Sequence, residues 1–165
     1  MPPSMTGASA TRCSWLSLKA TTTPARSVCP PFRSPVQYST PAGYLELGET
    51  AQEGALREAQ EEAGAALVLD GVLGLYSISR IGQVQVIFRA RFADGQPRFA
   101  PGEESLDVRL FAWDEIPWSE IAFPSVHWSL HAWRRAGDGP LGAPATNPAD
   151  DPRGTHPETP VEASI

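Results

Sequence analysis

Residues 43–65, GYLELGETAQEGALREAQEEAGA, constrain the fold more than any other stretch of this chain. Thr50 and Glu53 form a capping box, which satisfies two backbone amides and predicts a helix that begins at about Ala51. Alanine, leucine, glutamine and glutamate continue the helix with high propensity, and Gly64 can adopt the left-handed conformation that ends it. The segment therefore predicts one helix of about three to four turns.

Three carboxylates are expected on adjoining parts of one face of this helix. Glu58 and Glu62 are four residues apart, and Glu61 is three from Glu58. Acids this close repel one another unless a cation lies among them, and an oxygen-rich site with water in its remaining positions favours Mg²⁺ or Mn²⁺ over zinc. The alternative interpretation is a solvated acidic helix face, which is what most runs of glutamate are.

The spacing of the fixed residues favours the metal site. It runs Gly43, five residues, Glu49, seven residues, Arg57-Glu58-Ala59, one residue, Glu61-Glu62, one residue, Gly64-Ala65. This pattern resembles the Nudix box at every fixed position, with alanine at 59 and 65 where larger aliphatic residues are usual. A nine-position match across 23 residues is a far more specific signal than a lone glycine fingerprint. The resemblance implies a Nudix-type α/β/α sandwich with a mixed sheet.

The pattern of the following residues also indicates an α+β fold. Residues 66–69 and 72–78 are predicted strands, joined by a tight turn at Asp70-Gly71. Residues 83–92 and 106–113 alternate as half-buried strands, and a final helix is expected at about 125–135. Strands before and after a helix, followed by a terminal helix, are typical of an α+β sandwich.

The downstream sequence resembles the Nudix subgroup that cleaves FAD and ADP-ribose. The similarity covers about residues 41–135, including DGVLGLYSISRIGQVQVIFRARF and RFAPGEESLDVRLFAWDEIPWSEIAFPSV. It implies a pyrophosphatase that cleaves the diphosphate of nucleoside diphosphates linked to another moiety, with FAD or ADP-ribose favoured and AMP released. Substrate preference in this family lies in loops outside the box. The alternative is a non-catalytic Nudix-like module that binds nucleotide or a partner, or an inactive truncated gene product.

The resemblance assigns roles around the metal residue by residue. Glu58 and Glu62 are the primary ligands, the main-chain carbonyl of Ala42 is a third, and Glu61 is a further ligand or a water-mediated contact. Mg²⁺, with Mn²⁺ as the alternative, would neutralise the diphosphate and help deprotonate the attacking water without a covalent intermediate. Arg57 would orient Glu58 or Glu61 through a bidentate pair.

Residues outside the ligand set complete the expected site. Glu104 is the candidate general base, with a solvated acid in a turn as the alternative, and Glu103 could share its role. Tyr44 and Glu46 are candidates for substrate contact because their loop opens onto the metal. We assign Glu61, Glu104 and Arg57 to the catalytic set. The structural residues of the motif are Gly43, Gly64 and Glu49, of which Glu49 would anchor Arg57 or the loop.

Charge and composition exclude several partners. The net charge is −6 and the 13 basic residues form no cluster, which argues against nucleic-acid binding. No apolar run approaches the roughly 18 residues of a membrane span. The two cysteines, Cys13 and Cys29, form no CxxC pair and fit thiols in a reducing compartment. We expect a cytoplasmic protein with a small-molecule nucleotide substrate and no membrane or nucleic-acid partner, with a homodimer left open.

Three further interpretations concern the ends of the chain and its histidines. Residues 1–40 lack acids and do not match the family, so we expect an irregular segment with the amino-terminal strands missing or degraded. A reading-frame error or wrong start, a plastid transit peptide over about residues 1–30, and a divergent folded segment are the alternatives. The proline-rich, acidic residues 136–165 predict a disordered tail after a Nudix domain at 41–135. His127 and His131 are expected to be surface or interface histidines rather than metal ligands, because no third ligand accompanies them.

Overall fold

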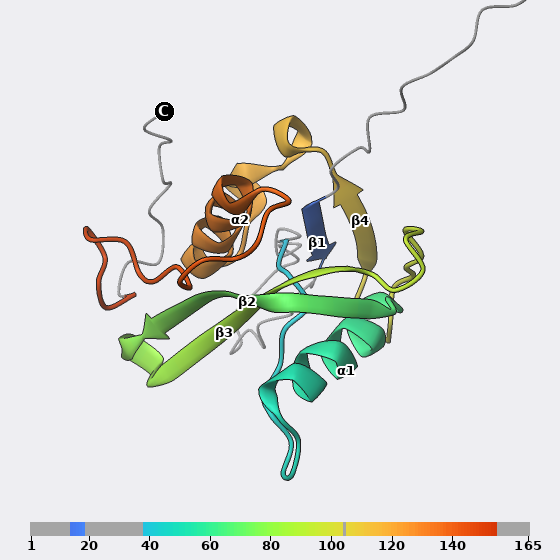
Figure 1. The fold of residues 1–165 in the computed structure, drawn as a ribbon, viewed down its shortest axis with the longest axis horizontal. Coiled ribbons are helices and arrows are strands. Elements are labelled where there is room, and N and C mark those ends of the chain that lie inside the picture. Colours follow the sequence, from blue (N-terminus) through green and yellow to red (C-terminus); the bar gives the residue numbers. More distant parts are fainter. Residues whose placement is uncertain (1–13, 19–37, 104, 155–165) are drawn as a thin grey trace, which may run out of the picture.

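The computed structural model of this chain describes residues 14–18, 38–103 and 105–154. The sheet elements are β1 (Ser14–Leu18), β2 (Leu67–Ile78), β3 (Gln83–Phe92) and β4 (Asp107–Phe111). The helices are α1 (Ala51–Ala63) and α2 (Pro124–Ala136), with 3₁₀ turns η1 (Ser79–Ile81), η2 (Trp113–Glu115) and η3 (Trp118–Glu120). In Figure 1 the β2–β3 pair crosses the middle of the molecule, with α1 on one side and α2 on the other. This mixed architecture confirms the predicted α+β class.

Helix α1 has the predicted bounds because its caps are local in sequence. The Thr50 side chain accepts a hydrogen bond from the backbone of Glu53, and the Glu53 carboxylate accepts one from the Thr50 backbone, at 3.3 and 2.7 Å. Gly64 follows the last turn in the left-handed conformation with φ 56°. Ala59 and Ala63 are buried on the inner face, where their small side chains allow the helix to lie close to the sheet. The capping-box prediction is confirmed.

The predicted hairpin at Asp70-Gly71 is wrong. Strand β2 runs through this dipeptide without turning, and it pairs antiparallel with β3 from one end to the other, with register shifts at Leu69/Gly71 and Val72/Gly74. The shifts are bulge-like irregularities, which a glycine inside a strand also signals. The Asp70 carboxylate forms ion pairs with Arg89 and Arg91 at 3.3 and 3.2 Å rather than stabilising a turn.

A strand is present where the amino-terminal strands were expected to be missing. Strand β1 pairs antiparallel with β4, from Ser14 opposite Phe111 to Leu18 opposite Asp107. Tyr38 adds an isolated parallel bridge to Ile121. The expectation of an irregular segment is therefore wrong at these positions, because the backbone groups of β4 find partners in β1. Residues 1–13 and 19–37 lie outside the described part of the chain.

Residues 137–154, which we name the C-terminal strap, are packed along the outer edge of β2. Ala145 accepts a hydrogen bond from the Leu75 backbone at 2.8 Å and donates one to Leu73 at 2.9 Å. Further along, the carbonyl of Arg153 accepts from the Ser79 backbone at 2.9 Å. The expected disorder from residue 136 is thus wrong for this segment, because the strap is held by backbone hydrogen bonds that its poor apolar composition does not reveal. Residues 155–165 lie outside the described part.

The core lies where the helices meet the strands. One cluster gathers around α2 and η3, and another joins α1 to β4. A third sets Tyr76 and Ile78 of β2 against Trp128 of α2. The first two clusters are formed by Tyr38, Ile116, Ile121, Val126 and Leu130, and by Ala63, Ala65 and Val108. Among the described residues, no helix is both long and apolar enough to cross a membrane.

Candidate active site

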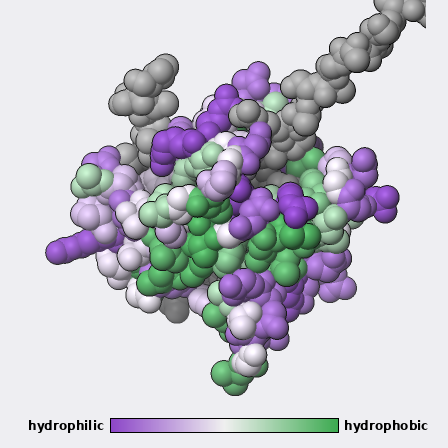
Figure 2. All heavy atoms as spheres, viewed as in Figure 1, coloured by the Kyte–Doolittle hydropathy of each residue, from purple (hydrophilic) through white to green (hydrophobic). Residues whose placement is uncertain are grey.

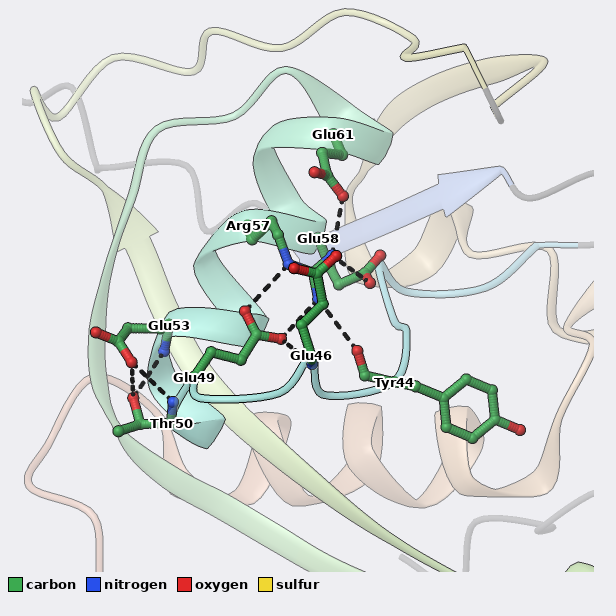
Figure 3. A network of polar contacts seen from close by, with 8 residues as sticks. All are labelled: Tyr44, Glu46, Glu49, Thr50, Glu53, Arg57, Glu58 and Glu61. Carbon is green, nitrogen blue, oxygen red and sulfur yellow. Dashed lines mark hydrogen bonds and ion pairs between the residues drawn. The ribbon is translucent and has the colours of Figure 1, made fainter.

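Arg57 lies at the centre of an acidic network on α1 and the preceding loop (Figure 3). We use the name acidic network for Glu49, Arg57, Glu58 and Glu61. The guanidinium makes a two-pronged pair with Glu49, in which Nε donates to Oε2 at 3.1 Å and Nη2 donates to Oε1 at 2.8 Å. Such a fork fixes the plane of the guanidinium as well as its position. Glu49 therefore anchors Arg57, as one of the two predicted alternatives for its role states.

The third nitrogen of Arg57 connects two predicted metal ligands. Nη1 donates to Glu58 Oε1 at 2.8 Å and to Glu61 Oε2 at 2.9 Å. The prediction that Arg57 forms its bidentate pair with Glu58 or Glu61 is wrong in the partner, because Nε and Nη2 both donate to Glu49 of the preceding loop. The hydrogen bonds to Glu49, Glu58 and Glu61 raise the pKa of Arg57 further above its usual value, and the bond from Arg57 lowers the pKa of Glu49.

The loop before α1 is shaped by hydrogen bonds to Glu49. The backbone N–H of Glu46 donates to Glu49 Oε1 at 2.7 Å, and the backbone N–H of Glu49 donates to the Glu46 carbonyl at 3.3 Å. The loop tip carries Tyr44, Leu45 and Leu47, all exposed, with Tyr44 at 79%. Figure 2 shows this apolar tip projecting from the lower end of the molecule. The two predicted substrate residues, Tyr44 and Glu46, therefore lie on an accessible loop beside the acidic network.

Glu58 and Glu62 both face the turn at Ala42 and Gly43. Glu62 is only 2% exposed, and its Oε2 accepts a hydrogen bond from the Ala42 backbone N–H at 3.0 Å. A Cβ atom at residue 43 would overlap the carboxylate of Glu58 in its observed position, so glycine is needed for this close approach. The structure thus brings the two predicted primary ligands to the same short stretch of backbone as the predicted Ala42 carbonyl.

The donor atoms near this turn suit a hard cation, and each of the three acids also has a hydrogen-bond partner within the protein. All three acids, Glu58, Glu61 and Glu62, offer oxygen, which Mg²⁺ and Mn²⁺ prefer. In the described residues, no three His, Cys, Asp or Glu side chains gather closely enough to form a ready metal cluster. Glu58 and Glu61 turn toward Arg57, and Glu62 turns toward the Ala42 amide. Arg57 binds one oxygen of Glu58 and one of Glu61, and each carboxylate has a second oxygen with which to bind a metal.

The loop that carries Glu103 and Glu104 is attached to the C-terminal end of α1. The backbone N–H of Gly102 donates to the Glu62 carbonyl at 3.1 Å, and that of Ala100 donates to Ala63 at 2.9 Å. A Cβ atom at residue 102 would overlap the Glu61 carbonyl, a close-approach requirement that the sequence interpretation missed. Glu104 itself lies outside the described residues, so its role as the general base stays a prediction.

The two histidines of α2 lie in an aromatic cluster. The ring of His131 stacks on Trp118 with centroids 5.1 Å apart, and His127 lies 5.5 Å from the same ring. Burial lowers the pKa of both histidines below its usual value. Their partners in the described structure are thus aromatic rings.

Comparison with known proteins places the chain in a family. The model of the NUDIX domain matches residues 22–133, so the match begins inside the segment 1–40 that we expected to lie outside the domain. Over 79 residues the chain is 34% identical to a MutT-like protein of Streptomyces ambofaciens. That alignment covers 48% of this chain and 50% of the relative, so the chain spans about half the length of the curated protein it matches.

Solved structures show the same fold. The crystal structure of a NUDIX hydrolase from Nitrosomonas europaea aligns with a TM-score of 0.64 and 34% identity, covering 82% of this chain and 71% of that one. An ADP-ribose pyrophosphatase from Streptococcus suis shares the fold with a TM-score of 0.57 and 16% identity. The alignment covers 68% of this chain and 83% of the pyrophosphatase chain. The family model spans more than half of the sequence, and this chain therefore belongs to the Nudix family.

Proposed function

We propose that this chain is a metal-dependent hydrolase that splits the diphosphate of a nucleoside diphosphate linked to another moiety, with FAD or ADP-ribose favoured and AMP released. The observation that carries the proposal is the acidic network, in which Arg57 holds Glu58 and Glu61 beside the buried Glu62. The similarity to a NUDIX hydrolase at 34% identity supports hydrolysis. The fold shared with an ADP-ribose pyrophosphatase agrees with the substrate class.

Three acids of α1 are the metal ligands in this proposal, and Arg57 positions two of them. Glu58, Glu62 and Glu61, with the Ala42 carbonyl, would hold Mg²⁺ or Mn²⁺, which when bound neutralises diphosphate charge and lowers the pKa of water. Arg57 keeps Glu58 and Glu61 oriented, since its plane is fixed from the other side by Glu49. This arrangement preorganises the carboxylates before the substrate arrives, which is where electrostatic catalysis gains its advantage.

The proton of the attacking water would go to Glu104. The loop carrying this residue is tied to α1 through the hydrogen bond from Gly102 to the Glu62 carbonyl. A general base must come within hydrogen-bond reach of the water, and the attachment of its loop to the ligand-bearing helix supports that position. Cleavage of the phosphoanhydride bond by this water leaves AMP and the monophosphate of the other moiety, which then separate.

A substrate panel with controlled metal tests the proposal. The full chain is incubated with FAD, ADP-ribose or ATP in Mg²⁺ or Mn²⁺, and AMP release is measured by chromatography. We expect AMP from FAD or ADP-ribose, release that stops when the metal is chelated, and recovery when it is restored. If the folded chain releases no AMP under any of these conditions, the hydrolase proposal is wrong. A thermal shift with ADP-ribose in that case would favour the binding-module alternative.

A further inference from the structure

Tyr44 is held at two points by separate parts of the chain. Its carbonyl accepts a hydrogen bond from Arg57 Nη2 at 3.1 Å, and its hydroxyl accepts one from Nε2 of Gln83. Figure 3 shows the ring directed away from Arg57. The residue is nevertheless 79% exposed. An exposed aromatic ring with a restrained orientation thus stands beside the acidic network.

Such a ring suits the aromatic base of a nucleotide. A flat side chain stacks on adenine or flavin at low cost in conformational entropy, and the cost falls further if the ring is already oriented. The diphosphate and the base of one substrate are linked, so a base platform next to the diphosphate site would contact the same molecule. Gln83 then matters because it fixes the outer end of the ring.

Gln83 borders the tip of the β2–β3 hairpin, which we define as residues 79–82, and the C-terminal strap is hydrogen-bonded to this end of the hairpin. Gln83 is the first residue of β3 and follows η1 and Gly82 directly. On the β2 side of this tip, the Asn147 side chain accepts from the Ser77 backbone N–H at 2.7 Å and donates to the Ser77 carbonyl at 2.9 Å. The Arg153 carbonyl accepts from both the backbone and the hydroxyl of Ser79, at 2.9 and 2.8 Å. The strap therefore holds both β2 and η1 at the end where Gln83 begins β3.

We propose that Gln83 is a positioning residue for substrate recognition, which holds Tyr44 as a stacking platform for the aromatic base, and that the strap holds Gln83 through the hairpin tip. This inference rests on the proposed function, because the platform needs a nucleotide substrate. In this proposal Gln83 acts on the Tyr44 hydroxyl and not on the diphosphate or the attacking water. Its loss therefore weakens the binding of substrate and leaves the chemical step intact.

A double-mutant cycle between Gln83 and Tyr44 measures this hold. Gln83→Met and Tyr44→Phe each remove the same hydrogen bond, so each raises KM for FAD or ADP-ribose about fivefold with kcat unchanged, the scale of one hydrogen bond. The double variant raises KM no further, because the second change has no bond left to remove. Gln85→Met is the matched control, since Gln85 lies two residues along β3 and pairs in register with Tyr76. We expect its KM to be normal.

The strap is tested with a readout that needs no activity. The chain has three tyrosines, of which Tyr38 and Tyr76 are buried. Ring-labelled tyrosine therefore gives one signal from an exposed ring, which Tyr44→Phe identifies by NMR. Asn147→Ala should shift this signal in the same direction as Gln83→Met and raise KM about twofold, a fraction of the effect of losing the bond itself. Thr146→Ala, at the exposed neighbouring position of the strap, should leave both unchanged.

The outcomes separate the inference from the function on which it rests. Additive increases of KM in the double variant, or a fall in kcat with normal KM in Gln83→Met, would show that Gln83 does not act through Tyr44. An unmoved Tyr44 signal in Asn147→Ala would remove the strap from the proposal. If the parent chain releases no AMP from either substrate, the hydrolase and its base platform both fail, while the NMR signal still decides whether Gln83 holds the ring.

Discussion

The box segment at 43–65 and the C-terminal strap show two ways in which this chain specifies structure. In the box, the partners are close in sequence: Thr50 caps with Glu53, and Arg57 reaches Glu58 and Glu61 on the same helix. In the strap, Ala145 and Asn147 bind residues of β2 that are about 70 positions away. Composition and spacing predict the first kind of contact well. They give little indication of the second.

The two regions also differ in the kind of interaction they contain. The acidic network is dense in charge, and its members keep the partial exposure that the proposed substrate site would need. The strap contributes mostly backbone and amide hydrogen bonds along one strand edge, which protect that edge from unwanted pairing. Substitutions in the box should therefore change turnover more than stability, and substitutions in the strap should do the reverse.

The largest effect is expected at the buried acid of the box. Glu62→Gln should lower the turnover of FAD or ADP-ribose by at least about a hundredfold, the scale of a lost catalytic electrostatic contact. The amide oxygen can still accept the Ala42 N–H, so the fold should persist. AMP release at saturating Mg²⁺ measures the effect. Glu53→Gln is the matched control on the same helix, because glutamine also serves in a capping box. Near-normal release by Glu62→Gln would remove Glu62 from the site.

Glu104→Gln tests whether the chemistry extends beyond the box. If Glu104 is the general base, turnover should fall about a hundredfold while metal affinity stays nearly intact, since a base acts on the water in the transition state. The pH–rate profile should lose its acidic limb. Glu103→Gln is the control for charge in the same loop. An unchanged profile in Glu104→Gln would argue against this role, and a larger loss in Glu103→Gln would transfer the role to its neighbour.

Arg57→Lys addresses the centre of the acidic network. A lysine ammonium is a point charge and cannot bind Glu49 with a fork while also reaching Glu58 and Glu61. We expect turnover to fall about tenfold, with a smaller change in stability because the pairs are partly exposed. Steady-state kinetics and urea denaturation give the two values. Arg91→Lys on β3 is the control, since Arg91 is largely exposed and pairs with Asp70. A normal turnover in Arg57→Lys would mean that a positive charge at residue 57 is sufficient for turnover and that the two-pronged pair with Glu49 is not needed.

Asn147→Ala should have the opposite profile. The Asn147 side chain makes three hydrogen bonds, two to Ser77 and one to the Asp151 carbonyl at 3.3 Å. Their loss should reduce the free energy of unfolding by about 1–3 kcal/mol and leave kcat unchanged. Urea denaturation of Asn147→Ala and of the Thr146→Ala control measures the difference. Equal stabilities of the two variants would show that the Asn147 hydrogen bonds do not stabilise the fold, as expected if the strap were the disordered tail that its composition predicts.

The smallest effect is on the pH dependence of stability. Burial lowers the pKa of His127 and His131 below the usual 6.5, and each is lowered further by a nearby positive charge, His131 and Arg135 respectively. The unfolded chain therefore binds more protons than the folded chain just below pH 6.5, so stability is full above this pH and falls as acid is added. In the box, the Arg57 hydrogen bond lowers the pKa of Glu49 below 4.5, so its contribution is lost only in stronger acid.

Urea midpoints measured from about pH 7.5 to about pH 5.5 test whether the histidines lower stability before Glu49 does. Histidines titrate in that window and carboxylates do not. Substituting both histidines with glutamine should flatten the slope. Amide exchange over the same range should show α2 and the adjoining strap loosening before α1. Equal loosening of both regions would contradict the assignment of this slope to the histidines.

Some sequence predictions failed because they depended on which distant segment supplies a partner. Asp70-Gly71 has the composition of a tight turn, yet β3 pairs along the whole of β2 and two arginines take up the Asp70 carboxylate. Gln83 looked like an ordinary strand residue, and nothing nearby in sequence indicates that it reaches Tyr44. These features become visible only when strands and loops are brought together.

The sequence by itself determined the bounds of α1, the course of β3, the presence of α2, and the place of Glu58, Glu61 and Glu62 on one helix. In each case the deciding interactions lie within about one helical turn or along one alternating strand, so spacing alone encodes them. Only the tertiary structure decided that Glu49 takes the fork of Arg57, that Gly102 ties its loop to α1, and that the strap borders β2. The first contact depends on how the loop before α1 folds back onto the helix, and the other two join backbone groups far apart in the chain, which local pattern does not pair.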